Sequence, residues 1–160
     1  MAIAVGEQLP LDIALSEMRD GTPESLTLGD IVRGRRVVVF AVPGAFTPTC
    51  NVQLPGYVDQ AEAIKAKGID EIVCLSVNDA YVMEAWGHDA GADGRVRMVA
   101  DGNGDLARAL GLSVDLSRFA MGVRSQRFAL VARDGRVEHL LVETTPGLDA
   151  SSAESVLAVL

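Results

Sequence analysis

One cysteine stands where a buried strand is expected to give way to a helix. The run from Val37 to Cys50 reads VVVFAVPGAFTPTC: an apolar strand, a turn at Pro43, and a short polar stretch that begins at Thr47. The first N–H groups of a helix have no internal partner, and their dipoles attract a nearby anion such as a thiolate. We therefore expect Cys50 to be a reactive thiol, exposed by its turn-rich surroundings, rather than an inert buried cysteine.

Length, charge and cysteine content narrow the class of protein. With 160 residues, the chain is expected to form one domain, 1–160. Its formal net charge of −8 argues against nucleic acid or an anionic membrane as a partner. It has no long apolar stretch and no signal-peptide pattern, and its two cysteines make no disulfide framework. We therefore expect a cytoplasmic location.

Apolar strands alternate with helical segments along the chain, and a strong hairpin signal, Asp134-Gly135, lies near the end. The pattern predicts an α/β domain of thioredoxin type, with three layers and a mixed central sheet covered by helices on both faces. A turn is expected at Asp20–Pro23. Strands are expected at 11–18, 37–42, 71–77, 95–100, 126–133 and 136–143, and helices at 26–31, 48–67, 80–90, 105–110 and 151–160.

Several motifs, in order, resemble those of one family. They are PGAFTPTC, LPGY, CLSVNDAYVMEAW, GRVRMVAD, and RSQRFALV with the DG turn behind it. Together they resemble the type II, or peroxiredoxin 5-like, group of peroxiredoxins from about residue 3 to residue 160. The resemblance implies a thiol peroxidase for hydrogen peroxide and alkyl hydroperoxides that needs no metal, haem or flavin.

The resemblance also implies roles for the loop residues. Cys50 would be the peroxidatic cysteine, oxidised to sulfenic acid. The Thr47 hydroxyl would bind the sulfur and the peroxide, and backbone N–H groups around Thr49 would complete the donor set. Gly44 and Phe46, in the same loop, would also line the peroxide site. The plainer alternative for Thr47 is a turn or cap residue.

Two further residues would shape the pocket. Pro43 would shield it without an N–H that competes for peroxide, although it could simply stiffen the loop. Arg127 matches the distant arginine of the family, whose guanidinium favours an ionised sulfur. Arg124 is a rival, and we favour Arg127 because it directly precedes the strand that begins near Phe128.

The second cysteine, Cys74, lies inside the apolar run EIVCLSV. We favour a packing role for it over a role as the resolving thiol, because its strand position indicates burial and a bridge to Cys50 needs close alpha carbons. The expected cycle therefore uses an external thiol, either glutathione with glutaredoxin or thioredoxin, to reduce the sulfenic acid.

The chain departs from the family just after the reactive cysteine. Many relatives have serine next and a histidine before the LPG-like segment, whereas this chain reads CNVQLP from Cys50 to Pro55, with no histidine and one residue fewer. This difference leaves the shape of the first helical turn open.

A redox signalling protein and a cysteine hydrolase are the alternative functions for this chain. A redox signalling protein could use the same cysteine to pass a disulfide to a partner. A cysteine hydrolase is disfavoured because neither His88 nor His139 has a catalytic or metal-binding context.

A homodimer is expected. Its face would use Phe46, Trp86, Phe119 and Met121, with core packing an equal alternative for each.

Overall fold

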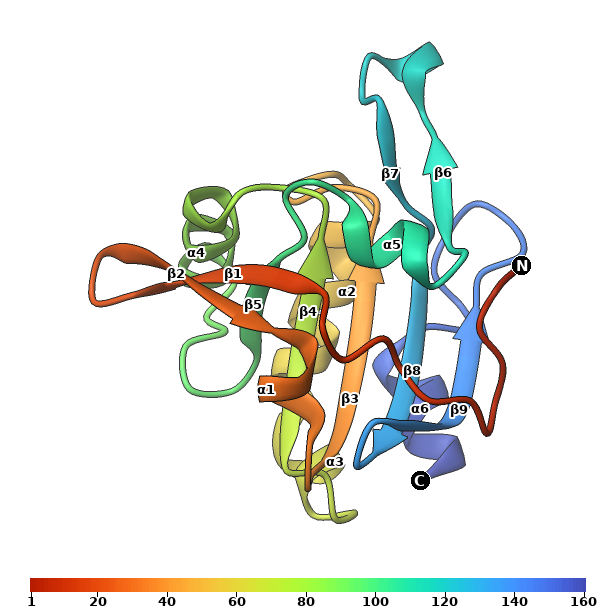
Figure 1. The fold of residues 1–160 in the computed structure, drawn as a ribbon. Helices are drawn as coiled ribbons and strands as arrows, with labels where there is room; N and C mark the ends of the chain where they lie inside the picture. The colour runs from red at the N-terminus through yellow and green to blue at the C-terminus, as the bar shows by residue number, and fades with distance from the viewer.

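The computed structural model describes residues 1–160 and is organised around one seven-stranded mixed sheet (Figure 1). The strand order is β2-β1-β5-β4-β3-β8-β9; β3, β4 and β5 run parallel, and β8 pairs antiparallel to β3. The strands of this sheet are β1 (Ala14–Arg19), β2 (Thr22–Thr27), β3 (Arg36–Val42), β4 (Glu71–Ser76), β5 (Arg97–Ala100), β8 (Phe128–Arg133) and β9 (Arg136–Val142).

The central strand β3 shows why both faces of the sheet are covered. Its side chains alternate, so that Val38, Phe40 and Val42 belong to one apolar cluster and the residues between them to another. Helices α2 (Cys50–Asp59), α3 (Ala61–Lys65), α4 (Ala80–Asp89) and α6 (Ala153–Val159) contribute to the first cluster, and α1 (Leu28–Val32) and α5 (Asp105–Ala109) contribute to the second. The prediction of a three-layer, thioredoxin-type α/β fold is therefore confirmed.

The N-terminal region contains a hairpin that the sequence did not reveal. The turn comprises only Asp20 and Gly21, both at positive φ, and strand β2 follows at once. Pro23, which we expected in the turn, lies inside β2. The strand tolerates this proline because it forms the edge of the sheet, where a missing N–H breaks no inner ladder.

A second hairpin extends away from the sheet, at the top of Figure 1. Strands β6 (Ser113–Asp115) and β7 (Val123–Ser125) pair only with each other, and a 3-10 turn (Ser117–Phe119) forms the tip. These strands are too short to show a period-two pattern, which explains why they were not predicted.

The helix expected over 48–67 is two helices, because the backbone at Gln60 leaves helical geometry between α2 and α3. The remaining predicted elements are present with shifts of a few residues at their ends. None of the helices is long and apolar enough to cross a membrane.

Candidate active site

Cys50 is the first residue of α2 and lies directly behind the loop that follows β3. Its Sγ lies 2.7 Å from the hydroxyl oxygen of Thr47 and 3.3 Å from a guanidinium nitrogen of Arg127. The residue is 0% exposed, so the expectation of an exposed thiol was wrong. The loop covers the sulfur, and the polar groups that contact it come from two distant parts of the chain.

The Thr47 hydroxyl has one proton and two neighbours that could accept it. It lies 2.8 Å from the carbonyl oxygen of Gly44 as well as against the Cys50 sulfur. When the sulfur is a thiolate, the hydroxyl donates to it; when the sulfur carries a proton, the hydroxyl can donate to Gly44 and accept from the S–H. Thr47 can therefore adapt to either ionisation state without moving.

Backbone donors are also free at this position. The N–H groups of Thr49 and Cys50 donate to no other group of the protein. Thr49 precedes α2 as its N-cap, but its side chain makes no capping hydrogen bond. Two N–H groups at the start of a helix are thus available to an anionic or polar ligand beside the sulfur.

Arg127 approaches the sulfur from the segment just before β8. Its guanidinium donates to the sulfur and, at 2.7 Å, to the side-chain oxygen of Gln53. A permanent positive charge at this distance attracts negative charge on the sulfur or on a ligand beside it. Gln53 is 1% exposed, so the oxygen that accepts from the guanidinium lies inside the protein.

Gln53 is itself held by a buried network. Its side-chain amide donates to the carbonyl and hydroxyl oxygens of Ser151, and the Ser151 hydroxyl donates to Glu143 at 2.6 Å. Burial acts to raise the pKa of Glu143, but hydrogen bonds from Ser151 and from neighbouring backbone N–H groups outweigh it and lower the pKa. A carboxylate near the C-terminus thus anchors the chain of contacts that ends at the sulfur.

The loop in front of the cysteine is tied down by the rival arginine, Arg124. It donates to the carbonyl oxygens of Pro43 and Met121, at 3.2 and 2.8 Å. Arg124 therefore holds the loop in place and does not contact the sulfur, which Arg127 does. A Cβ on Gly44 would lie only 3.1 Å from both Arg124 and Met121, which explains the glycine at this position.

Two asparagines complete the attachment of the loop. Asn78 accepts from the backbone N–H of Ala45 at 3.0 Å. Asn51 donates to the carbonyl oxygen of Phe46 at 3.1 Å and accepts from the indole N–H of Trp86 at 2.7 Å. These contacts hold Phe46 at a φ of 63°, which is unusual for a residue with a side chain.

Comparison with known proteins agrees with this geometry. The profile of the Redoxin family matches residues 4–157. Peroxiredoxin-2E-2, chloroplastic, of Oryza sativa is 48% identical over 99% of this chain and 72% of its own length. The chain belongs to the peroxiredoxin family. Reduced Prx3 of Vibrio vulnificus in complex with H2O2 superposes with a TM-score of 0.93 at 43% identity, covering 98% of both chains. Peroxiredoxin 5 of Alvinella pompejana has a TM-score of 0.86 at 33% identity, covering 98% of this chain and 96% of its own.

The structure places the predicted site residues of this peroxiredoxin together. Thr47 and Arg127 contact the sulfur, Thr49 precedes it in the chain, and Pro43, Gly44 and Phe46 form the loop in front of it. Reasoning from the sequence missed Gln53, Asn51 and the loop contact of Asn78. The only sequence signals for them were the departure CNVQLP and the SVND motif, and neither indicates which side chains meet in space. Asp79 does cap α4, accepting from the N–H of Val82.

The second cysteine lies in the middle of β4, between Phe40 on β3 and Met98 on β5. Cys74 is 0% exposed, belongs to the apolar cluster that contains Cys50, and forms no disulfide. Burial raises the pKa of the Cys74 thiol well above its usual range, and the nearby Cys50 raises it further. These surroundings fit the packing role that we favoured.

The residues expected at a dimer face divide into two groups. Phe46 and Phe119 are 44% and 60% exposed, and Met121 is partly buried. Trp86 is completely buried and tilts toward Phe46 with ring centroids 6.3 Å apart. Trp86 is therefore a support of the active-site loop and cannot belong to an exposed face.

The histidines take no part in the site. No group of three or more His, Cys, Asp or Glu side chains is arranged to hold a metal ion. His88 pairs with Asp93 and Glu84 on the surface, and the hydrogen bond with Asp93 is the main reason that its pKa is raised.

Proposed function

We propose that this peroxiredoxin is a thiol peroxidase that reduces hydrogen peroxide and small alkyl hydroperoxides at Cys50. The observation that carries the proposal is the convergence of the Thr47 hydroxyl, the Arg127 guanidinium and two free backbone N–H groups on one sulfur. Such a set of donors favours the thiolate and can bind a peroxide beside it.

The reaction can be written on these residues. The thiolate of Cys50 attacks one peroxide oxygen, an S–O bond forms, and the O–O bond breaks. The sulfur becomes a sulfenic acid, and the departing oxygen takes a proton and leaves as water or an alcohol. Arg127 and the N–H groups of Thr49 and Cys50 stabilise the negative charge that develops on the departing oxygen.

The loop residues would define the peroxide site. The Thr47 hydroxyl orients the attacked peroxide oxygen, and Pro43 closes one side with no N–H to compete. Gly44 leaves space where a side chain would collide with Arg124, and Phe46 covers the outer rim.

We further propose that an external thiol completes the cycle. Cys74 lies inside the sheet with a strongly disfavoured thiolate, so it is poorly placed to attack a sulfenic acid. A thiol of glutathione or thioredoxin would attack the sulfur, releasing water and leaving a mixed disulfide, which a second thiol then reduces. Glutathione with glutaredoxin and thioredoxin are both candidates.

Peroxide consumption by three proteins tests these proposals. Wild type, Cys50→Ser and Cys74→Ser would each be supplied with glutathione plus glutaredoxin or with thioredoxin. We expect no turnover by Cys50→Ser and nearly full turnover by Cys74→Ser, and the better reductant is the one that serves the enzyme. Loss of activity in a folded Cys74→Ser protein would make Cys74 the resolving thiol. A wild type that turns over no peroxide would favour a protein that relays oxidation to a partner.

We also propose a homodimer whose interface includes the exposed Phe46 and Phe119, because both large apolar side chains lie near the active-site end of the molecule. A Phe119→Glu variant is expected to shift the mass measured by light scattering from dimer to monomer. An unchanged mass would place the interface elsewhere or exclude the dimer. The cytoplasmic location stays a prediction.

A further inference from the structure

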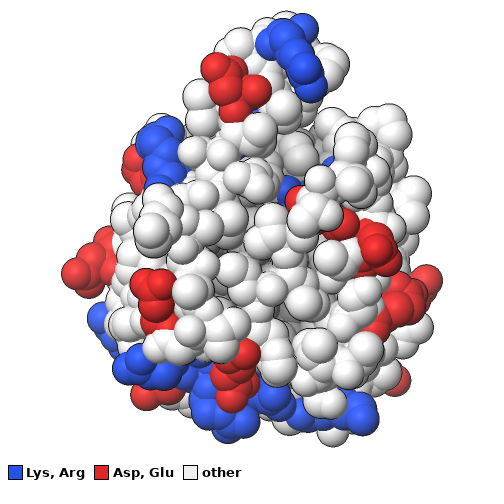
Figure 2. Space-filling view, turned by 90° about the vertical axis from the view of Figure 1, so that its right-hand side faces the viewer, with Lys and Arg blue, Asp and Glu red and all other residues white.

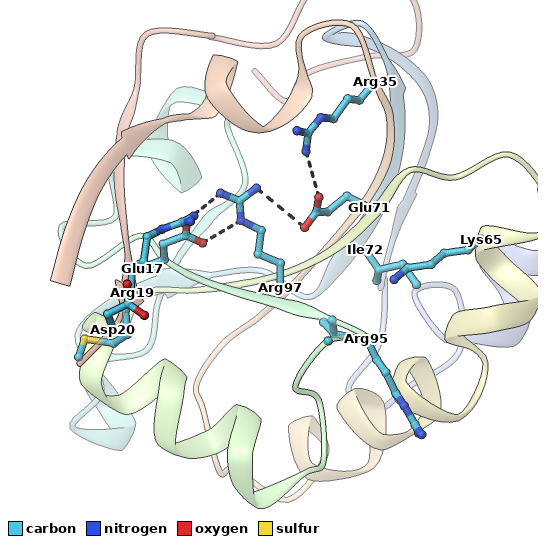
Figure 3. A pocket seen from close by; sticks show the side chains of 12 residues that line it. Glu17, Arg19, Asp20, Arg35, Lys65, Glu71, Ile72, Arg95 and Arg97 are labelled. Atoms are coloured by element: carbon cyan, nitrogen blue, oxygen red, sulfur yellow. Dashed lines mark hydrogen bonds and ion pairs between the residues drawn. The ribbon is translucent and has the colours of Figure 1, made fainter. Parts of the chain in front are cut away.

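Figure 3 shows the largest cavity of the molecule, which has a volume of about 690 Å³ and contains no residue of the active-site loop in its lining. Arg35, just before β3, and Glu71, at the start of β4, line it, whereas Cys50 follows the other end of β3. The cleft therefore opens at the opposite end of the parallel strands. It exists because β1 pairs with β5 only at Ser16 and Ala100, beyond which the two strands separate.

The lining of this cleft is basic and polar. Only three of its twelve residues are hydrophobic. It contains three carboxylates, Glu17, Asp20 and Glu71, and five cations, Arg19, Arg35, Lys65, Arg95 and Arg97. The local charge of +2 stands out in a chain of net charge −8. On the face shown in Figure 2, Lys and Arg side chains also gather along the lower edge, where β3 and β4 begin.

Two arginines of the cleft are paired with carboxylates of the protein. Arg97 forms a two-point contact with Glu17, at 2.8 and 2.7 Å, and lies 3.9 Å from Glu71. Arg35 donates to the other oxygen of Glu71 at 3.0 Å. Each of these guanidiniums keeps N–H donors that the carboxylates do not use, because a guanidinium carries five.

Two cations of the cleft have no partner within the protein. Lys65, at the end of α3, and Arg95, before β5, form no ion pair and no side-chain hydrogen bond. Figure 3 shows both on one side of the cleft, whereas Asp20 lies on the other side beside Arg19. The unpaired cations and the unpaired carboxylate are therefore separated across the opening.

We propose that this cleft binds a small multivalent anion of the phosphate type. Lys65 and Arg95 would supply the charge, and the unused N–H donors of Arg35 and Arg97 would supply hydrogen bonds from the floor. The volume is within the range of small-molecule sites, and the scarcity of apolar lining excludes a ligand held mainly by the hydrophobic effect. Phosphate groups of a nucleotide or of a simple phosphate ester share this chemistry.

Isothermal titration calorimetry of the full chain with tripolyphosphate and with ATP tests the proposal. We expect saturable binding of tripolyphosphate that weakens as sodium chloride is raised. Stronger binding of ATP would show that a nucleoside adds contacts, and equal binding would assign recognition to the phosphates alone. Absence of saturable binding of both probes at low salt would overturn the proposal.

Matched variants distinguish binding in this cleft from diffuse electrostatic attraction to the protein surface. Lys65→Met and Arg95→Met are each expected to weaken binding about fivefold, the factor that corresponds to a surface charge contact of about 1 kcal/mol. Lys67→Met removes an exposed charge near Lys65 that does not line the cleft, and should leave binding unchanged. Equal weakening by Lys67→Met would mean diffuse attraction and contradict the assignment.

A fourth variant is expected to tighten binding. Asp20→Asn removes the unpaired carboxylate that opposes an anion, and asparagine tolerates the positive φ of 52° at this position. No gain in affinity, together with wild-type binding by Lys65→Met, would show that the anion lies outside this cleft.

Discussion

The two cysteines of this peroxiredoxin have the same exposure and opposite surroundings. Cys50 and Cys74 are both 0% exposed and contribute to the same apolar cluster. The Cys50 sulfur is contacted by a hydroxyl and a guanidinium, whereas Cys74 lies in the middle of a sheet strand, and burial raises the pKa of its thiol. Equal burial therefore leaves the two thiols in different chemical surroundings. We propose that the donors that reach the sulfur, and not its exposure, decide which thiol reacts.

The backbone near the two sulfurs is also held in place by different kinds of hydrogen bond. Cys74 is held by strand pairing with β3 and β5. The loop before Cys50 depends on side chains instead: Arg124 binds the carbonyl of Pro43, and Asn78 binds the N–H of Ala45. The free N–H groups of Thr49 and Cys50 follow from a further difference, because Cys50 begins a helix whereas Cys74 lies within a strand.

The largest expected effect comes from making the Cys50 surroundings as apolar as those of Cys74. Thr47→Val keeps the shape of the side chain and removes the hydroxyl that donates to the sulfur. We expect the second-order rate constant with hydrogen peroxide to fall by about 10²–10³-fold, as for loss of one donor in other transition-state sites. Stopped-flow measurement should show that Thr47→Ser, which keeps the hydroxyl, retains most of the rate.

Removing the charge beside Cys50 should have a somewhat smaller effect. Arg127→Met takes away the guanidinium 3.3 Å from the sulfur and is expected to lower the rate by about a hundredfold at neutral pH. Arg133→Met, at the far end of β8 and paired with Glu138, serves as the control, and an equal loss there would refute a specific role.

Gln53 is expected to act through Arg127 and thus to have a moderate effect. Gln53→Leu removes the oxygen that the guanidinium contacts at 2.7 Å, and we expect about a tenfold slower reaction, the loss that corresponds to about 1.4 kcal/mol. Gln53→Glu keeps an acceptor for Arg127, but it loses the donor to Ser151 and brings a negative charge near the sulfur, so it should recover only part of the rate. If both variants are equally slow but folded, the contact does not position the guanidinium.

The smallest effect on the rate is expected at Cys74, where stability should change instead. Cys74→Ser places a hydroxyl in an apolar strand and should lower the free energy of unfolding by about 1–3 kcal/mol, while Cys74→Ala avoids the buried polar group. Urea denaturation followed by Trp86 fluorescence measures this difference. A rate constant for the reaction of peroxide that fell in parallel would link Cys74 to the chemistry.

The sequence was informative about residues that follow one another and less so about residues that meet in space. The run from Pro43 to Cys50 could be interpreted as a turn between a strand and a helix, and the resemblance to the peroxiredoxins pointed to Arg127. Gln53 was missed because its importance depends on Arg127, 74 positions away in the chain. The burial of Cys50 was also missed, since turn residues indicate a loop but not what covers it.

The secondary structure was likewise predicted where the signal is local and missed where it depends on contacts in space. Long apolar strands such as β3 and β4 were predicted from their composition, and the Asp134-Gly135 turn from its residue types. The β6–β7 hairpin could not be predicted, because its strands have three residues each and pair only with each other. The Asp20-Gly21 turn was predicted too long, since Pro23 is tolerated only through the edge position of β2.

The most direct test is to identify which sulfur a single equivalent of hydrogen peroxide oxidises. The reduced protein would be treated in the presence of dimedone, which traps sulfenic acid, and digested for mass spectrometry. Our account predicts rapid dimedone labelling of the peptide that contains Cys50 and none of the peptide that contains Cys74. Labelling of Cys74 at a comparable rate in the folded protein would contradict the claim that the donors around the sulfur determine its reactivity.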